Sequence, residues 1–172
     1  WHLESNLTPE DIYWGALLGH AEMIENGITC VADRYFHMDE VARAVSDSGI
    51  RANLVWTIFG HEDEDKLNRT IKFIHDWQGS ADGRITTWMG PHAPYTCGPD
   101  FLQRIGKIAQ DMNVGIHIHV SETEEQVNRS INEHGITPVK MLEKTGILTV
   151  PTILGHCSYP KDDDIRILAG VD

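Results

Sequence analysis

The chain has 172 residues, and 41 % of them are hydrophobic, which is enough for one domain with a buried core. Its 26 acidic residues outnumber its 14 Lys and Arg residues, and the net charge of −12 argues against a nucleic-acid polymer or an anionic membrane surface as a partner. No run of about 18 apolar residues and no secretory leader pattern is present. We therefore expect a cytoplasmic protein without a membrane span.

The hydrophobic pattern alternates between helical and strand periods along the chain. Thr8 and Pro9 are typical of a helix start, and apolar residues at helical spacing continue to about Glu25. The β-branched run from Ile28 to Ala32 predicts a strand covered on both faces. Further strands are expected at 51–56, 84–89, 114–120 and 151–155, and further helices at 39–48, 64–77, 100–112, 124–133, 138–145 and 162–169.

Five strands with room for a crossover helix after each predict an α/β fold with parallel strands. An open doubly wound sheet and part of a (β/α)8 TIM barrel both satisfy this pattern. No glycine-rich phosphate-binding fingerprint occurs, which argues against the nucleotide-binding form of the open sheet. Polar residues follow the predicted strand ends, as they do in barrel enzymes: Asp33, His92, His119, Glu122 and His156. Because a complete barrel needs about 250 residues, the chain would be part of one.

The densest group of chemically capable residues lies in segment 115–123, Gly-Ile-His-Ile-His-Val-Ser-Glu-Thr. Period-two alternation places His117 and His119 on one face of a strand, and Glu122 falls in the turn beyond it. An imidazole in a barrel lumen can bind a divalent metal ion, and a nearby carboxylate can move protons to and from water that the metal activates. The competing interpretation is two core histidines held by hydrogen bonds and a solvated acid at a helix start.

His92 lies in the segment 90–99, which contains three prolines and two glycines. This composition predicts a restricted loop that holds His92 and Tyr95 over a pocket, although a rigid connector would have the same composition.

His156 follows another predicted strand, where a structural role is the simpler interpretation for a lone histidine. Cys157 or Ser158 beside it would serve as a nucleophile in an alternative open-sheet hydrolase. Neighbouring residues on a strand point to opposite faces, which argues against a nucleophile pair with His156.

Four motifs, taken in order, resemble the amidohydrolase superfamily, and within it the 5′-methylthioadenosine/S-adenosylhomocysteine deaminases and related triazine chlorohydrolases. They are Asn-Gly-Ile-Thr-Cys-Val-Ala-Asp at 26–33, Gly-Pro-His-Ala-Pro-Tyr-Thr-Cys at 90–97, His-Ile-His-Val-Ser-Glu-Thr-Glu at 117–124 and Gly-His-Cys at 155–157. The resemblance covers essentially the whole chain and favours the barrel over the open sheet.

The resemblance implies a role for each matching position. His119 corresponds to the metal ligand at the end of the fifth strand, and Glu122 to the carboxylate that moves protons between water and the substrate ring nitrogen. His156 corresponds to a catalytic histidine that contacts the water or substrate. His92 and Trp1 correspond to residues that contact substrate or line its pocket.

The remaining ligands of the family, a His-x-His pair on the first strand and an Asp on the eighth, have no match here. The resemblance therefore implies that residues 1–172 form a single incomplete barrel segment, about strands two to six, of a longer catalytic domain. One divalent metal ion is expected, with zinc preferred over Fe, Mn or Ni, and its other ligands lie outside this chain.

The activity implied is metal-dependent deamination of an amino-substituted purine nucleoside or related N-heterocycle, by hydrolysis of a C–N bond that is not a peptide bond. Expected partners are the small heterocyclic substrate, water and further copies of the chain in a homo-oligomer. The segment alone would be inactive. The alternatives are a triazine-type chlorohydrolase and a non-catalytic truncated barrel fragment.

Overall fold

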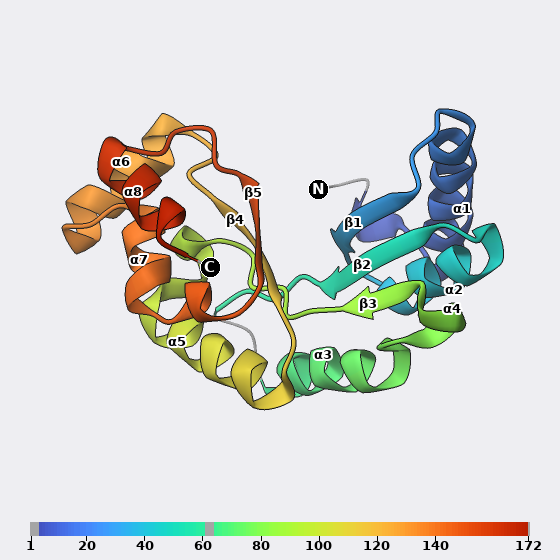
Figure 1. The fold of residues 1–172 in the computed structure, drawn as a ribbon. Helices are drawn as coiled ribbons and strands as arrows, with labels where there is room; N and C mark the ends of the chain where they lie inside the picture. The colour runs from blue at the N-terminus through green and yellow to red at the C-terminus, as the bar shows by residue number, and fades with distance from the viewer. Residues whose placement is uncertain (1–3, 61–63, 172) are drawn as a thin grey trace. The chain divides into compact units, whose positions relative to one another are not determined.

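The computed structural model describes residues 4–60 and 64–171 (Figure 1). Its contacts divide the chain into two compact units, residues 1–56 with 68–88 and residues 57–67 with 89–172. The elements of the first unit are η1 (Glu4–Asn6), α1 (Pro9–Glu25), β1 (Cys30–Tyr35), α2 (Met38–Ser48), β2 (Arg51–Trp56), most of α3 (Glu64–Trp77), α4 (Ser80–Gly83) and β3 (Ile85–Thr87).

The first unit contains a parallel three-stranded sheet in the order β1-β2-β3. Residues 52–56 of the central strand β2 are buried, whereas Cys30 and Ala32 of the edge strand β1 are exposed. The prediction of a strand at 28–32 covered on both faces is therefore wrong in two respects. The strand begins at Cys30 and extends to Tyr35, and at the edge of its sheet its side chains alternate between exposed and partly buried.

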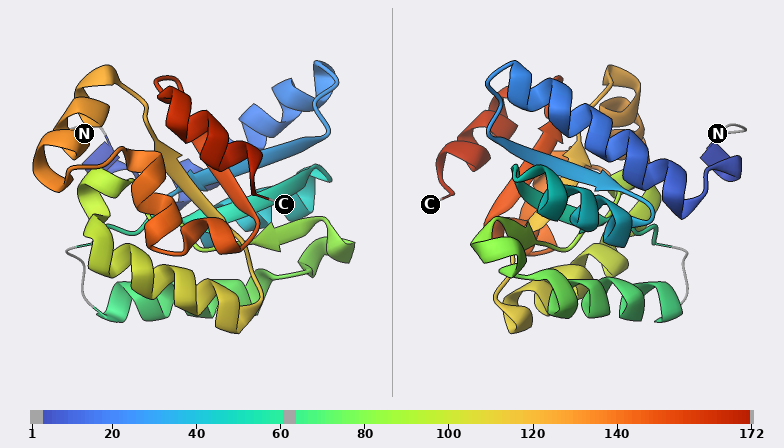
Figure 2. Two further views of the ribbon diagram at one scale, coloured as in Figure 1. Left: turned by 60° about the vertical axis from the view of Figure 1, so that its left-hand side comes forward. Right: turned by 90° about the vertical axis from the view of Figure 1, so that its right-hand side faces the viewer.

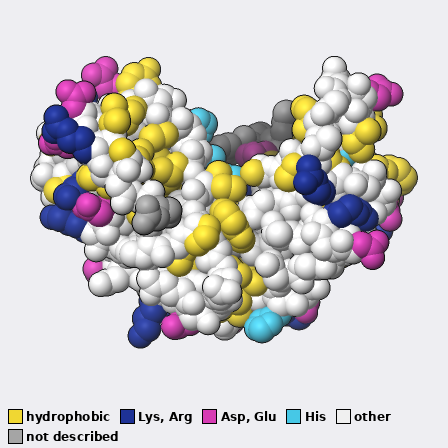
Figure 3. Space-filling view, in the orientation of Figure 1, with side chains coloured by type: hydrophobic (Ala, Val, Ile, Leu, Met, Phe, Trp, Pro, Cys, Tyr) yellow, Lys and Arg dark blue, Asp and Glu magenta, His cyan; other side chains and the backbone are white. Residues whose placement is uncertain are grey.

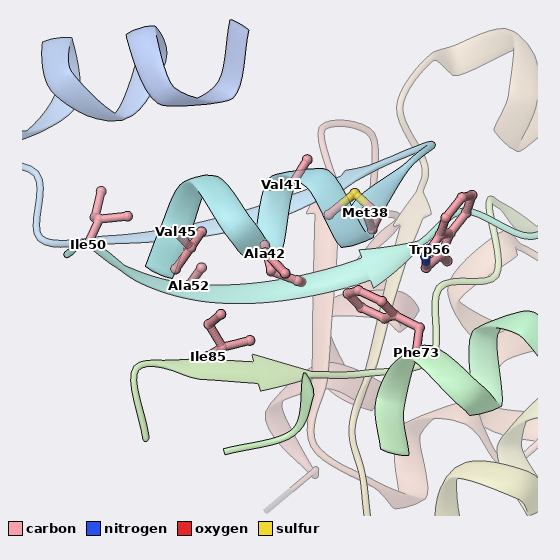
Figure 4. Packing of buried hydrophobic residues seen from close by; sticks show 10 residues of the cluster. Met38, Val41, Ala42, Val45, Ile50, Ala52, Trp56, Phe73 and Ile85 are labelled. Atoms are coloured by element: carbon pink, nitrogen blue, oxygen red, sulfur yellow. The ribbon is translucent and has the colours of Figure 1, made fainter. Parts of the chain in front are cut away.

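The core of this unit forms between α2 and the sheet (Figure 4). The apolar side of α2, including Val41 and Val45, is buried with the side chains of Ala52 and Ile85 from the strands and Phe73 from α3. The long helix α1 packs against α2 and covers it further (Figure 2). This packing explains why the helical periods in these segments predicted α2 and α3 well, since their apolar faces are the buried ones. In α1, by contrast, Leu18 and Ile24 of the apolar spacing are exposed.

The second unit contains a parallel pair of strands, β4 (Ile116–Val120) and β5 (Thr152–His156). Its helices are α5 (Pro94–Met112), α6 (Glu124–His134), α7 (Pro138–Lys144), the short η2 (Ile147–Thr149) and α8 (Asp162–Ala169). In the pairing register His119 lies opposite Gly155 and Val120 opposite His156. Isolated parallel bridges join Met89 to Ile116 and Ile58 to Pro91, so the segment before His92 runs alongside β4.

The segment 90–99 is only partly the loop that its composition predicted. Helix α5 already begins at Pro94, because a proline at the first helical position has the backbone angle that a helix needs and loses no hydrogen bond there. The helix is interrupted at Gly98, whose φ of 69° only glycine adopts readily, and it resumes at Pro99. His92 therefore lies just before a helical turn.

No helix in the described parts of the chain is long and apolar enough to cross a bilayer. The part of the second unit that carries α6, α7 and α8 presents hydrophobic side chains between charged ones (Figure 3). Ile131, Tyr159 and Ile165 are among the exposed large hydrophobic residues of this unit.

Candidate functional site

Four of the predicted site residues lie at the carboxyl ends of parallel strands or bridges of the second unit. His92 follows the bridged residue Pro91, His119 is the penultimate residue of β4, Glu122 lies two residues beyond β4, and His156 ends β5. Parallel strands present their carboxyl ends at one edge, so the topology brings these positions together.

The other two positions lie outside this group of strand ends. Asp33 lies inside β1 of the first unit, two residues before the strand ends, and not just after a strand as expected. Trp1 lies outside the described residues, so its predicted contact with substrate stays a prediction.

Backbone hydrogen bonds tie the strand ends to one another. The amide of His119 donates to the carbonyl of His92 at 3.0 Å, and the amide of Cys157 donates to the carbonyl of Val120 at 3.0 Å. The amide of His92 in turn donates to the carbonyl of Ile58 at 2.8 Å. The histidines are thus held by ladder-type bonds and not by loose loops, which limits how far their rings can move apart.

The three imidazole rings form a contiguous row. The ring centroids of His119 and His156 are 4.8 Å apart, and those of His119 and His92 are 5.5 Å apart. His119 therefore occupies the centre of the row. A Cβ atom on Gly155 would lie 2.6 Å from His119 Nδ1, so the glycine in β5 leaves the space that this ring occupies.

Glu122 lies beside this row and uses its two carboxylate oxygens differently. Oε1 is 3.7 Å from His156 Nε2, whereas Oε2 accepts a hydrogen bond from Gln126 Nε2 at 3.3 Å. Gln126 is on the first turn of α6, where Thr123 caps the helix by accepting from the Gln126 amide. The helix start therefore fixes the side chain that orients Glu122, and Oε1 is the oxygen that faces the histidines.

Non-glycine residues take left-handed backbone conformations at the ends of both strands. Ser121 has a φ of 48°, His156 one of 64° and Cys157 one of 48°. Each such residue costs on the order of 1–3 kcal/mol, and such strain concentrates at functional sites. Hydrogen bonds from the amides of Ser158 and Tyr159 to the carbonyl of Ser121 hold the two turns together.

Aromatic side chains enclose His92. Phe59 lies 4.8 Å from the His92 ring, centroid to centroid, and Tyr95 lies 5.8 Å from it nearly perpendicular. Burial and, secondarily, the charge of Glu122 raise the pKa of Tyr95, so its hydroxyl remains a neutral donor at physiological pH. Tyr95 was expected near the site, but nothing in the local sequence pattern pointed to Phe59.

A small cavity of about 20 Å³ adjoins the row at His119. Tyr95, Val120 and Met141 supply apolar lining, and Ser121 lies in its wall. The hydroxyl of Ser121 is buried and has no hydrogen-bond partner within the described ranges 4–60 and 64–171. A polar atom of this kind is satisfied by water or by a polar group of a ligand.

The donor set fits part of a metal site. Imidazole nitrogens suit Zn, Cu, Fe and Ni, and the row offers His119 flanked by His156. Across residues 4–60 and 64–171 no group of three or more His, Cys, Asp or Glu side chains is placed to hold a metal ion. His117 is buried earlier on the same strand face, with its ring 6.3 Å from that of His119, so it does not complete such a group. Residues 4–60 and 64–171 thus provide part of a metal coordination shell.

Curated relatives match the chain over nearly its whole length. It is 46 % identical over 172 residues to a 5-methylthioadenosine/S-adenosylhomocysteine deaminase of Thermoanaerobacter pseudethanolicus, and 48 % identical over 171 residues to one of Carboxydothermus hydrogenoformans. Both alignments cover 98 % of this chain and 40 % of the relative. The chain therefore spans about two fifths of the length of the curated relatives it matches.

Solved structures match its fold. A crystal structure of an adenosine deaminase from Xanthomonas campestris with bound zinc superposes with a TM-score of 0.89 at 27 % identity, covering 97 % of this chain and 39 % of that one. A triazine hydrolase from Arthrobacter aurescens superposes with a TM-score of 0.86 at 23 % identity, covering 99 % of this chain and 42 % of that one. The prediction of an α/β fold that is part of a (β/α)8 barrel is confirmed.

A sequence model described as "Amidohydrolase family" matches residues 1–170, so the resemblance of the four motifs is confirmed, and the chain belongs to the amidohydrolase family.

Proposed function

We propose that the protein carrying this chain is a metal-dependent deaminase of an amino-substituted purine nucleoside or a related N-heterocycle. The observation that carries the proposal is the placement of Glu122 Oε1 beside the imidazole row of His119 and His156, in a chain 46 % identical to curated deaminases of adenosine derivatives. The row and Glu122 together supply ligand and proton-transfer groups at the carboxyl ends of the parallel strands. Hydrolytic removal of an amino group requires this arrangement.

His119 is the proposed metal ligand in this chain, and zinc is the preferred ion. A bound divalent ion would lower the pKa of a water molecule to near neutrality and so supply a hydroxide nucleophile. We propose that the other ligands come from parts of the protein outside residues 1–172. Fe, Mn and Ni remain alternatives, because imidazole binds each of them.

Glu122 is the proposed proton carrier. Oε1 accepts a proton from the attacking water and delivers it to the ring nitrogen next to the carbon that bears the amino group. Oε2 keeps its hydrogen bond from Gln126, so Oε1 remains the oxygen that faces the reacting atoms. The carbon then becomes a carbonyl carbon, and ammonia leaves with the second proton. Proton transfer by a positioned carboxylate of this kind contributes about 10²- to 10⁴-fold to the rate.

His156 and His92 are proposed to hold the reacting molecules. His156 Nε2 lies on the Glu122 side of the row, where it contacts the water or the forming tetrahedral centre. His92 is enclosed by Phe59 and Tyr95, whose rings suit the apolar faces of a substrate, and it contacts a hydroxyl group of that substrate. Trp1 is proposed to line the same pocket.

Broader proposals accompany this function. Residues 1–172 form one incomplete barrel segment of the catalytic domain, and the segment by itself is inactive. The protein acts in the cytoplasm and as a homo-oligomer. Its partners are the heterocyclic substrate and water, with no nucleic-acid polymer and no membrane surface among them.

The test of the function is a screen of the full-length protein for ammonia release. We expect turnover of methylthioadenosine or adenosylhomocysteine, with guanine, cytosine and melamine as comparison substrates. Chloride release from a chlorotriazine without ammonia release from any aminopurine would favour the alternative of a chlorohydrolase. No turnover by a zinc-loaded full-length protein would favour the non-catalytic fragment.

Replacement of the proposed proton carrier tests the mechanism. In the full-length protein Glu122→Gln should reduce kcat by about 10²- to 10⁴-fold with zinc content unchanged, because the amide keeps the shape but cannot accept the proton. Glu125→Gln, on the exposed side of the same helix, makes the same charge change away from the row and serves as the matched control. Wild-type turnover by Glu122→Gln would remove this mechanism.

A further inference from the structure

Thr96 makes a contact with His92 that the proposed reaction does not use. Its Oγ1 lies 2.9 Å from His92 Nδ1. The same Oγ1 lies 3.1 Å from the carbonyl oxygen of Ala93, three residues earlier. Thr96 is on the first turn of α5, which Pro94 begins, so the helix fixes the position of the hydroxyl relative to both atoms.

Only one placement of protons makes both of these contacts hydrogen bonds. A hydroxyl has one proton to donate, and a carbonyl oxygen can only accept. If the Thr96 proton goes to the Ala93 carbonyl, then Nδ1 must be the donor in the 2.9 Å contact. If the proton went to Nδ1 instead, two oxygens with lone pairs would face each other at 3.1 Å without a proton between them.

We infer that Thr96 is a positioning residue that holds His92 with its proton on Nδ1, which assigns Nε2 to accept a hydrogen bond from a hydroxyl group of the substrate. The inference rests on the proposed function for the identity of the bonded group, a sugar hydroxyl, but the tautomer itself follows from the contacts of Thr96. The rings of Phe59, Tyr95 and His119 lie beside the His92 ring, with centroids 4.8, 5.8 and 5.5 Å from its own, and restrict its rotation.

This assignment gives the hydroxyl of Thr96 a role in substrate selection. An acceptor nitrogen at His92 distinguishes a ribosyl substrate, which offers a hydroxyl donor, from an analogue that lacks that hydroxyl. A site that hydrogen-bonds a hydroxyl group of its substrate discriminates against the analogue without that hydroxyl.

The tautomer is measured in the full-length protein by long-range ¹H–¹⁵N correlation spectra of ¹⁵N-histidine-labelled samples, with His92→Asn identifying the His92 signals. We expect a protonated Nδ1 and an unprotonated Nε2 near neutral pH in the wild type and in Thr96→Ser, which keeps the hydroxyl. Thr96→Val should lose this preference. A wild-type signal with Nε2 protonated, or an unchanged tautomer in Thr96→Val, would overturn the inference.

Steady-state kinetics supply the second readout. Thr96→Val should raise KM for the nucleoside by about tenfold, as expected for loss of one hydrogen bond, and change KM for an analogue without the bonded hydroxyl little. Thr96→Ser should restore the wild-type values.

Thr145→Val is the matched control, because Thr145 donates to the Met141 carbonyl at 2.8 Å in the same back-bonding manner but contacts no histidine. An equal rise in KM for nucleoside and analogue in Thr96→Val would overturn the role of Thr96 in substrate selection. So would an equal rise in KM in Thr145→Val. A full-length protein that deaminated no nucleoside would overturn the proposed function, whereas the tautomer spectra would still decide the assignment for His92.

Discussion

Histidines in this chain differ in chemistry because their surroundings differ. His119 has imidazole neighbours on both sides, whereas His20 of the first unit is buried between α1 and α2, with Nδ1 3.2 Å from Ser48 Oγ. Burial lowers the pKa of His20, and a hydrogen bond to the Ala44 carbonyl opposes this shift in part. The same residue type thus serves a proposed reaction at one place and packing at another.

The lowered pKa of His20 predicts a loss of stability in mild acid. Below about pH 6.5 the unfolded chain takes up a proton at His20 that the folded chain resists, so stability falls as the pH drops towards the lowered folded pKa. The thermal midpoint of the full-length protein should therefore fall more between about pH 7.5 and about pH 5.5 in the wild type than in His20→Gln.

Nearby Asp33 acts in the opposite sense, because burial raises its pKa and the folded chain gains a proton there first as the pH falls. His20 and Asp33 also interact through their charges, so the comparison of wild type with His20→Gln reports the histidine together with this coupling. Equal pH dependence of the thermal midpoints of wild type and His20→Gln would contradict the lowered pKa of His20.

Cys157 tests the alternative of a nucleophilic hydrolase at the residue scale. Burial raises the pKa of its thiol, which disfavours the thiolate that nucleophilic catalysis needs. Cys157→Ala in the full-length protein should therefore leave ammonia release unchanged. Loss of turnover in this variant, with zinc content and folding retained, would support the open-sheet hydrolase instead.

Strand β5 contributes Gly155 to the site, and the absence of a side chain there leaves room for the His119 ring. Because a Cβ atom there would lie 2.6 Å from His119 Nδ1, Gly155→Ala should displace the central ring of the row. We expect kcat/KM to fall by about 10²-fold, the typical effect of misplacing a catalytic group by about 1 Å, with zinc content reduced.

Gly15→Ala is the matched control for that substitution. A Cβ atom at Gly15, within α1, would meet no atom within 4 Å, so this change should leave activity intact and stabilise the helix by up to about 1 kcal/mol. Full activity and zinc content in Gly155→Ala would show that the ring does not depend on the space that Gly155 leaves.

The elements themselves were predicted well where periodicity is strong. The bounds of α3, β2 and α8 agree with the prediction to the residue, because apolar spacing, caps and charged first turns all indicate the same structure there. The start of α5 was missed because its first turn consists of Pro, Tyr, Thr and Cys without an apolar period. The site residue Thr96 lies in that turn, so the missed helix and the missed positioning residue have one cause.

At the scale of the whole molecule the chain has strand edges and exposed apolar side chains that a complete barrel would cover. In the strand pairs described, β1 and β5 each have a partner on one side, and partly buried or exposed residues occupy both. Each unit also has exposed apolar side chains, such as Trp14 and Leu18 on α1 of the first and Ile165 on α8 of the second. Such edges favour pairing with further strands or with other copies of the chain.

The incomplete ligand set gives a prediction at the same scale. Residues 1–172 expressed alone should bind zinc more weakly than the full-length protein by more than about 100-fold, because loss of even a supporting partner of a ligand costs about 10- to 100-fold. Competition with a chelating dye measures both affinities, and circular dichroism checks that the isolated chain is folded. A folded chain with the affinity of the full-length protein would contradict the proposal that its ligands are shared with other parts of the protein.

The sequence by itself determined the alternation of strands and helices, the parallel sheet and the positions of His92, His119, Glu122 and His156 at strand ends, because these follow from periods of two and 3.6 residues and from local turn signals. The contact between the rings of His119 and His156, the direction of Glu122 Oε1 and the bond from His92 to Thr96 were decided only by the tertiary structure. These contacts depend on the register between β4 and β5 and on backbone conformations such as that of His156, which are fixed by hydrogen bonds between distant segments that no local pattern encodes.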